Sequence, residues 1–219
     1  MTSPGMTVRP LEFADVASAA RLHAEAFPGF FLSALGPAFL REFYRGFVTD
    51  AAAVTVVALD GSGSIVGVVV GSTQPGGFFK RRVRKQLLGF IVASVLAVVR
   101  HPRSLPRLLK AVRYRGEVPV DVSGALLSSI CVSPNAQSAG VGRQLMDAWT
   151  NALREHGLSR AYLTTDRVNN EAANRFYVGA GWVCEAEYTT REGREMNCYS
   201  WRAEQHCSQQ NDDNGQEVS

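Results

Sequence analysis

One short stretch of the chain has the composition of an anion-binding loop. Its members, in order, are Gln137, Ser138, Ala139, Gly140, Val141, Gly142 and Arg143. Glycines lack side chains, so backbone N–H groups at such positions can approach a ligand closely. A helix predicted to begin here adds unpaired N–H groups and the positive end of its dipole, which favour a phosphate or pyrophosphate. A tight strand-to-helix turn is the structural alternative for the same two glycines.

The elements on either side of this loop would hold it in place. A β-branched and apolar strand is predicted at 126–132, and Arg160–Thr165 is predicted to be a second strand. Between them, a helix from Gly140 to about His156 is indicated by apolar residues at helical spacing, because they would share one buried face. These residues are Val141, Leu145, Trp149 and Leu153. The pattern predicts a strand–helix–strand crossover with the loop at its first corner.

The rest of the chain predicts alternating helices and strands. A hairpin is expected where Asp60–Ser64 joins two β-branched runs. The remaining elements are expected as a strand at 7–9, helices at 11–27 and 36–48, the hairpin strands at 53–59 and 65–72, a helix at 171–178 and strands near 182–190 and 195–202. The polar residues 203–219 are expected to form a disordered tail, because they hold too few apolar side chains to pack.

A second motif follows the loop about thirty residues downstream. Asn170-Glu171-Ala172-Ala173-Asn174-Arg175-Phe176-Tyr177 places a Tyr seven residues after an Asn, and Gly181-Trp182 comes just behind it. In this order, the loop and this motif resemble those of the GNAT acyltransferase superfamily, whose Q/R-x-x-G-x-G/A sequence wraps the pyrophosphate of coenzyme A. The resemblance covers residues 120–202 and extends to residues 6–73.

The resemblance implies a fold and a co-substrate. The fold is α/β, with a central mixed sheet of about six to seven strands flanked by helices. The fourth and fifth strands are expected to splay apart, with the acyl-pantetheine arm of acetyl-CoA between them and the amine arriving from the opposite side. Backbone groups at Ile130, Cys131 and Val132 would then border the pantetheine, although plain strand core explains these three residues equally well.

Tyr177 is the candidate catalytic residue. A phenol near the sulfur can supply a proton to the departing thiolate as a general acid; the competing interpretation is an aromatic ring packed in the core. Asn170 and Asn174 are candidates for polar contacts with acetyl-CoA, and helix capping competes for Asn170. Arg143 is close enough to the loop to add charge, while a solvated helix face is the alternative.

The general base is not evident. Many relatives carry a Glu on the fourth strand, where this chain has Ser128 and Ser129. A water chain is one alternative, since much of the rate can come from holding the amine beside the thioester. The other candidates, each acting through water, are Glu25, Glu117, Asp121 and Asp166.

Charge is distributed unevenly along the chain. The segment between Gly61 and Gly116 has no Asp or Glu and holds 11 of the 23 basic residues, so the remainder has 12 basic and 20 acidic side chains, a net charge of −8. Most of this segment is a helical basic insert predicted at 74–117, between the third and fourth strands. Its apolar run Leu87–Val99 is thirteen residues long, too short to span a bilayer, which needs about 20.

Three interpretations of the insert stay open. It can be a helical hairpin packed over the substrate side, or a cationic rim that attracts an anionic substrate. It can also be an interfacial helix that binds a membrane surface through residues 78–115. A nucleic-acid partner is not indicated, because the aromatic residues there form no reading motif.

Length and composition predict a single domain at 1–202, and the resemblance implies that it is an acyltransferase domain. The start of the chain lacks the basic and apolar regions of a signal peptide. The four cysteines are unevenly spread and the four histidines scattered, which indicates reduced thiols in a cytoplasmic protein and no metal site. We therefore expect an acetyl-CoA-dependent N-acetyltransferase that acts on a small primary amine such as an anionic amino sugar derivative. The alternative is a non-catalytic CoA-binding or membrane-surface module. The oligomeric state is not predicted.

Overall fold

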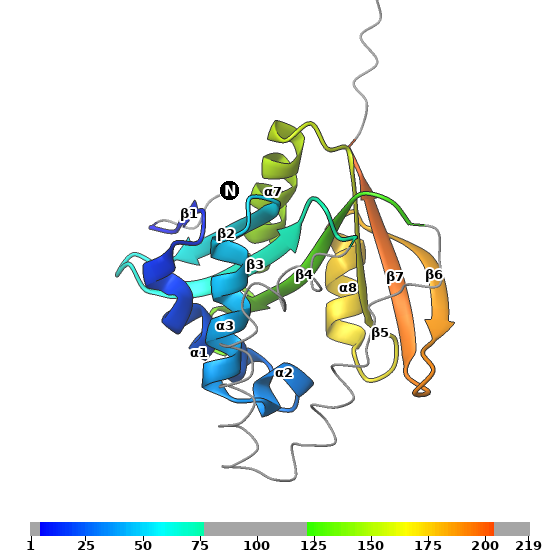
Figure 1. Cartoon of the computed structure of the whole chain (residues 1–219), viewed down its shortest axis with the longest axis horizontal. Helices are drawn as coiled ribbons and strands as arrows, with labels where there is room; N and C mark the ends of the chain where they lie inside the picture. Colours follow the sequence, from blue (N-terminus) through cyan, green and yellow to red (C-terminus); the bar gives the residue numbers. More distant parts are fainter. Residues whose placement is uncertain (1–4, 77–121, 204–219) are drawn as a thin grey trace, which may run out of the picture.

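A seven-stranded mixed sheet organises the protein (Figure 1). The computed structural model describes residues 5–76 and 122–203. Along the sheet the strand order is β1-β2-β3-β4-β5-β7-β6. The strands are β1 Thr7–Arg9, β2 Ala53–Leu59, β3 Ile65–Ser72, β4 Ala125–Val132, β5 Arg160–Asp166, β6 Val183–Thr189 and β7 Glu195–Arg202. The predicted mixed sheet of six to seven strands is confirmed.

Helices cover both faces of this sheet. They are η1 Phe13–Asp15, α1 Val16–Ala26, α2 Phe31–Ala34, α3 Pro37–Val48, η3 Pro134–Ala136, α7 Val141–Glu155 and α8 Glu171–Gly179. The helix expected at 11–27 is shorter than predicted, since its start is the 3₁₀ turn η1. The four-residue α2 was not predicted, because it is too short to show a helical period.

Two hydrophobic clusters lie on opposite faces of the sheet. In Figure 1, α1 and α3 lie in front of β2 and β3, and α7 lies behind them. One cluster joins α1 and α3 to the sheet through Val57, Val68 and Val70. The other cluster joins α7 and α8 to the residues on the opposite face of the sheet, such as Val54 and Val56 of β2. Both faces of β2 and β3 are therefore buried, which explains their nearly continuous β-branched sequence.

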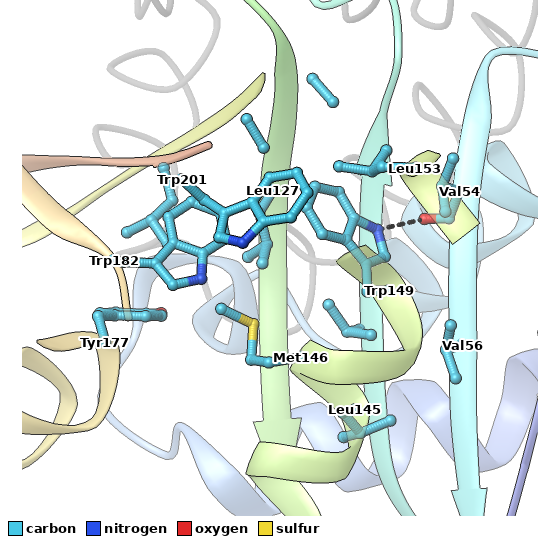
Figure 2. Close-up of a cluster of buried hydrophobic side chains, with 14 of the residues drawn as sticks. Val54, Val56, Leu127, Leu145, Met146, Trp149, Leu153, Tyr177, Trp182 and Trp201 are labelled. Carbon is cyan, nitrogen blue, oxygen red and sulfur yellow. Dashed lines mark hydrogen bonds between the residues drawn. The ribbon is translucent and has the colours of Figure 1, made fainter. Parts of the chain in front are cut away.

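Trp149 of α7 anchors the helix to the sheet. Its side chain is fully buried, and its indole Nε1–H donates to Val54 O at 3.0 Å (Figure 2). Gly71 of β3 makes room for it, because a Cβ there would lie 2.4 Å from Trp149 Cζ2. The predicted apolar face is confirmed, since Val141, Leu145 and Leu153 are buried with it.

Two predicted segments fall outside the described residues. Only the first three residues of the basic insert at 74–117 are described, so its helical hairpin, cationic rim and membrane-binding interpretations all concern residues beyond them. The same holds for the tail, of which only Ala203 is described. In the described part of the chain, no helix is long and apolar enough to cross a membrane.

Candidate functional site

The parallel strands β4 and β5 separate soon after they begin. They pair only at Ala125↔Ala161 and Leu126↔Tyr162. Figure 1 shows the two strands starting side by side and then diverging. β4 also bulges at this point, because Val70 pairs with Ser129 while Gly71 pairs with Leu127, which leaves Ser128 as the extra residue. Beyond the bulge, one edge of β4 has no neighbouring strand among residues 5–76 and 122–203.

The backbone of β4 presents polar groups along that open edge. Ser133 N–H donates to Val66 O of the neighbouring strand β3 at 2.8 Å. Because the N–H and C=O groups of a strand alternate in direction, those of Cys131 point to β3 and those of Ile130 and Val132 point to the open edge. The side chains of Ile130 and Val132 pack on the α7 side, and that of Cys131 lies in the α1–α3 cluster. Ile130 and Val132 thus combine partly buried side chains with outward amide groups.

The loop after β4 has an unusual backbone. Ser138 adopts φ 82° and Gly140, the N-cap of α7, adopts φ 76°. Left-handed geometry is natural for glycine but costs a serine of the order of 1 kcal/mol, and such strain is concentrated at functional positions. Gln144 N–H is the first to make an intrahelical bond, to Gly140 O at 3.1 Å. The N–H groups of the first turn, Val141 to Arg143, have no intrahelical acceptor.

Two contacts hold this loop and the start of α7 within the protein. Gln137, Ser138 and Ala139 precede the N-cap residue of α7, and the backbone N–H of Ala139 donates to Ala136 O at 3.3 Å. The Arg143 guanidinium pairs with Asp147 at 3.1 Å and donates through Nη1 to Gly179 O at 2.7 Å. The side chain is 56% exposed, as expected for a solvated helix face, and it also joins α7 to the end of α8.

Tyr177 lies on the buried face of α8. It is 8% exposed, and its ring lies against Phe176, Trp182 and Tyr199. Figure 2 shows Tyr177 beside Trp182 in the hydrophobic cluster. Burial, then the nearby Tyr199, raises the pKa of Tyr177 well above that of a free phenol. Within the described residues its hydroxyl makes no hydrogen bond, and it is protonated at every ordinary pH. The ring is therefore a core residue that also offers a free donor.

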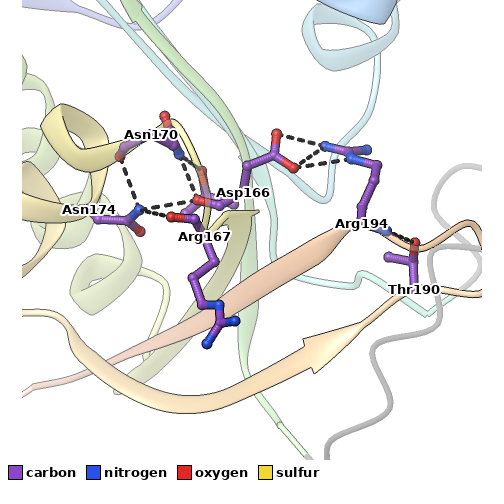
Figure 3. A network of polar contacts seen from close by, with 7 residues as sticks. Asp166, Arg167, Asn170, Asn174, Thr190 and Arg194 are labelled. Atoms are coloured by element: carbon purple, nitrogen blue, oxygen red, sulfur yellow. Dashed lines mark hydrogen bonds and ion pairs between the residues drawn. The ribbon is translucent and has the colours of Figure 1, made fainter.

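Asn170 and Asn174 belong to a polar network at the end of β5 (Figure 3). Asn170 is the N-cap residue of α8, but its amide makes no capping bond and donates instead to Thr165 Oγ1 at 2.7 Å and Asp166 O at 2.9 Å. Asn174 donates to Asp166 O at 3.1 Å and accepts from the Tyr199 hydroxyl at 3.0 Å. The capping role considered for Asn170 is not observed, and both amides tie α8 to the sheet.

The structure narrows the choice of general base. Asp166 is held by Arg194, whose Nη2 lies 2.8 Å from each carboxylate oxygen (Figure 3). Glu25 is half-exposed on α1 and lies 3.9 Å from Arg21, while Glu117 and Asp121 lie outside the described residues. On β4, the Ser128 hydroxyl is buried with no partner among the described residues.

Sequence analysis missed one buried polar chain. His23 Nδ1 lies 2.9 Å from the Tyr44 hydroxyl, which lies 3.7 Å from Cys131 Sγ. Burial lowers the pKa of His23 to about 4 and raises that of the Cys131 thiol to about 12. In the sequence His23 is only one of four scattered histidines, but in the structure it is 2% exposed. Its spacing from Val16, Ala19 and Ala20 on one helical face was the signal available.

Comparison with known proteins identifies the family. The model of the Acetyltransferase (GNAT) family matches residues 17–182, which include the glycine loop, the diverging strands and Tyr177. The chain belongs to the GNAT family.

Two curated GNAT relatives are similar over shorter stretches. GCN5-related N-acetyltransferase 7, chloroplastic, of Arabidopsis thaliana is 30% identical over 95 residues, 43% of this chain and 34% of that protein.

The second relative is an uncharacterized N-acetyltransferase ycf52-like of Prochlorococcus marinus, 29% identical over 105 residues, 48% of this chain and 53% of that protein. The matched stretch thus spans about a third of one curated relative and about half of the other.

Solved structures share the GNAT fold at low identity. The ribosomal-protein-S18-alanine N-acetyltransferase of Escherichia coli is 16% identical with a TM-score of 0.55, covering 92% of this chain and 97% of that one. The yncA protein of Salmonella typhimurium, solved with acetyl-CoA, is 14% identical with a TM-score of 0.57 over 93% and 97%. A spermidine N-acetyltransferase SpeG mutant of Vibrio cholerae is 17% identical with a TM-score of 0.54 over 91% and 95%. These likenesses confirm the predicted fold class.

Proposed function

We propose that this GNAT protein transfers the acetyl group of acetyl-CoA to a primary amine. One observation carries the proposal: the open edge of β4, with the outward amides of Ile130 and Val132, leads directly into the strained loop at the start of α7. A row of amides followed by a helix N-terminus suits a ligand with an amide-containing arm that ends in a pyrophosphate.

Each part of this surface has a distinct task. The backbone N–H groups from Gln137 to Arg143 would bind the pyrophosphate, with glycine at 140 because the left-handed turn must approach the ligand without a Cβ. Ile130 and Val132 would bond the pantetheine amides as a missing neighbouring strand would. The Asn170 and Asn174 amides would hold the end of β5 in place, because their own bonds within the protein are largely made.

Tyr177 would act on the leaving group. Acetyl-CoA supplies a thioester whose carbonyl carbon the amine attacks and whose thiolate departs. The Tyr177 hydroxyl is protonated and free, so it can donate to the sulfur as negative charge develops there. Because a buried phenol is a weaker acid than a thiol, a strengthening hydrogen bond is its main contribution.

The amine must also lose a proton. Asp166, one of the candidate carboxylates, is held by Arg194. We propose that a chain of water molecules removes this proton. Orientation of the amine next to the thioester then supplies much of the rate.

The identity of the acceptor amine is a separate proposal from the reaction. The similar structures include proteins named for acetylating spermidine and an alanine of ribosomal protein S18, so the fold accepts different amines. For this chain we propose a small anionic amine, such as an amino sugar derivative, because the basic residues of the insert would attract negative charge.

A thermal melt with and without acetyl-CoA tests the cofactor site. Ligand at 100 times its dissociation constant stabilises the protein by about 2.7 kcal/mol, which is roughly 5–10 °C for a domain of this size. Gly140→Leu should remove the rise. Gly157→Leu is the matched control, because Gly157 at the other end of α7 has φ 73° and equally open surroundings. Equal loss of the rise in both variants, or no rise in the native protein, would refute the proposed site.

A further inference from the structure

The first turn of α7 is in direct contact with α8. A Cβ on Gly142 would lie 3.1 Å from Cε2 of Phe176, so glycine at this position lets the turn close on the ring. The next residue, Arg143, donates through Nη1 to Gly179 O at 2.7 Å. The same residues belong to the proposed pyrophosphate loop. Two adjacent positions of that loop therefore touch the helix that carries Tyr177.

The bond from Arg143 completes the end of α8. The carbonyls of Phe176, Tyr177 and Val178 accept backbone N–H groups from Ala180, Trp182 and Gly181 respectively, at 2.9 to 3.0 Å. Gly179 is the last residue of the helix, and its carbonyl is satisfied by Arg143 instead. A guanidinium at a helix C-terminus is also favoured by the helix dipole.

Geometry makes this bond a suitable link between the two sites. α8 has nine residues, and a helix this short depends on tertiary contacts for its position. Tyr177 lies two residues before the carbonyl that Arg143 holds. Arg143 Nε also lies 3.1 and 3.2 Å from the two oxygens of Asp147, in an exposed ion pair that contributes little on its own.

We propose that Arg143 is a positioning residue, which couples occupation of the pyrophosphate loop to the placement of the Tyr177 hydroxyl. This inference rests on the proposed acetyltransferase function. A ligand that orders the first turn of α7 fixes the Arg143 backbone, and the Arg143 side chain passes that constraint to α8. The residue acts on the reaction through Tyr177 and on the ligand through its backbone N–H.

Hydrogen exchange tests the coupling without the acceptor amine. The probe is coenzyme A, and the measured peptides cover residues 138–146 and 171–182. We expect coenzyme A to slow exchange in both peptides of the native protein. In Arg143→Met it should slow exchange only in the first. Asp147→Asn is the matched control, because it removes the ion pair but keeps the bond to Gly179, so both peptides should remain protected.

Kinetics then separates positioning from phosphate binding. The acceptor for the assay is spermidine, glucosamine 6-phosphate or an alanine-terminated peptide, whichever the native protein turns over with acetyl-CoA. Arg143→Met should lower kcat about tenfold and change the KM for acetyl-CoA less than twofold. In the Tyr177→Phe background the same substitution should have little further effect, because the residue through which it acts is already absent.

Three results would overturn the proposal. They are undiminished protection of 171–182 in Arg143→Met, a tenfold rise in KM with kcat unchanged, and an equal loss of kcat in the Tyr177→Phe background. The second result would identify Arg143 as a phosphate counterion. Absence of protection in both peptides of the native protein is a different failure, because it would refute coenzyme A binding itself.

Discussion

The two edges of β4 are used in opposite ways. Toward β3, the strand is paired from Leu126 to Val132, interrupted only by the bulge. Toward β5, pairing stops after Leu126. The paired edge lies between two hydrophobic clusters, whereas the open edge leads to the glycine loop and Tyr177. One strand thus contributes stability through one edge and leaves backbone groups for a ligand along the other. Substitutions on the two sides should separate stability from activity.

The largest effect is expected on the open side, at Tyr177. Tyr177→Phe keeps the ring contacts with Trp182 and Tyr199 and removes a hydroxyl without a partner among the described residues. Stability should therefore change by less than about 1 kcal/mol. Turnover should fall by roughly 10²–10³-fold, the usual contribution of one hydrogen-bond donor to a developing negative charge, while the thermal shift with acetyl-CoA is kept.

Tyr199→Phe is the control for this prediction. It removes another phenol of the same cluster, one whose hydroxyl is bonded to Asn174 at 3.0 Å. We expect it to lower the free energy of unfolding by about 1 kcal/mol and to leave turnover within a few-fold of the native value. Equal turnover in Tyr177→Phe and the native protein would remove Tyr177 from the mechanism.

The paired side should be sensitive to acid through His23. The folded pKa is lowered to about 4, so between pH 6.5 and 4 the unfolded chain binds the proton and the folded chain does not. Stability is therefore complete above pH 6.5 and is lost as the pH falls toward 4, by about 3 kcal/mol.

Urea unfolding of the native protein and of His23→Gln across this pH range measures the effect. Glutamine can still accept a hydrogen bond from Tyr44, but it does not titrate. Between pH 7 and pH 4, the native protein should lose about 3 kcal/mol more of its free energy of unfolding than His23→Gln does. A constant difference would contradict the buried, neutral state of His23.

A substitution at Gly71 should damage the paired edge alone. An added Cβ would lie 2.4 Å from Trp149 Cζ2 and 2.5 Å from Leu126 O. Because one of these atoms is backbone, Gly71→Ala should cost about 2 kcal/mol of stability. The acetyl-CoA-induced rise in melting temperature should persist in the folded fraction. Gly29→Ala is the control and should be nearly neutral, because no atom of the described residues lies within 4 Å of the added Cβ.

The sequence predicts the features of both regions that are formed by residues close together in the chain. The α7 face at Val141, Leu145 and Trp149 follows from helical spacing, and Gly140 is recognisable because its turn is formed by neighbouring residues. The Arg143–Gly179 and Tyr44–Cys131 contacts join residues 36 and 87 positions apart, so they depend on how complete elements pack. The bulge at Ser128 depends on strand register, which a run of apolar residues does not fix.

The smallest effect is expected at Ser128, the extra residue at the point where the two edges of β4 diverge. Its hydroxyl is buried without a partner among the described residues, and burying such a group is unfavourable. Ser128→Ala should thus raise the free energy of unfolding by about 1 kcal/mol, measured in urea. Lower stability would show that the hydroxyl is bonded in the protein, and the bulge would then belong to the paired edge.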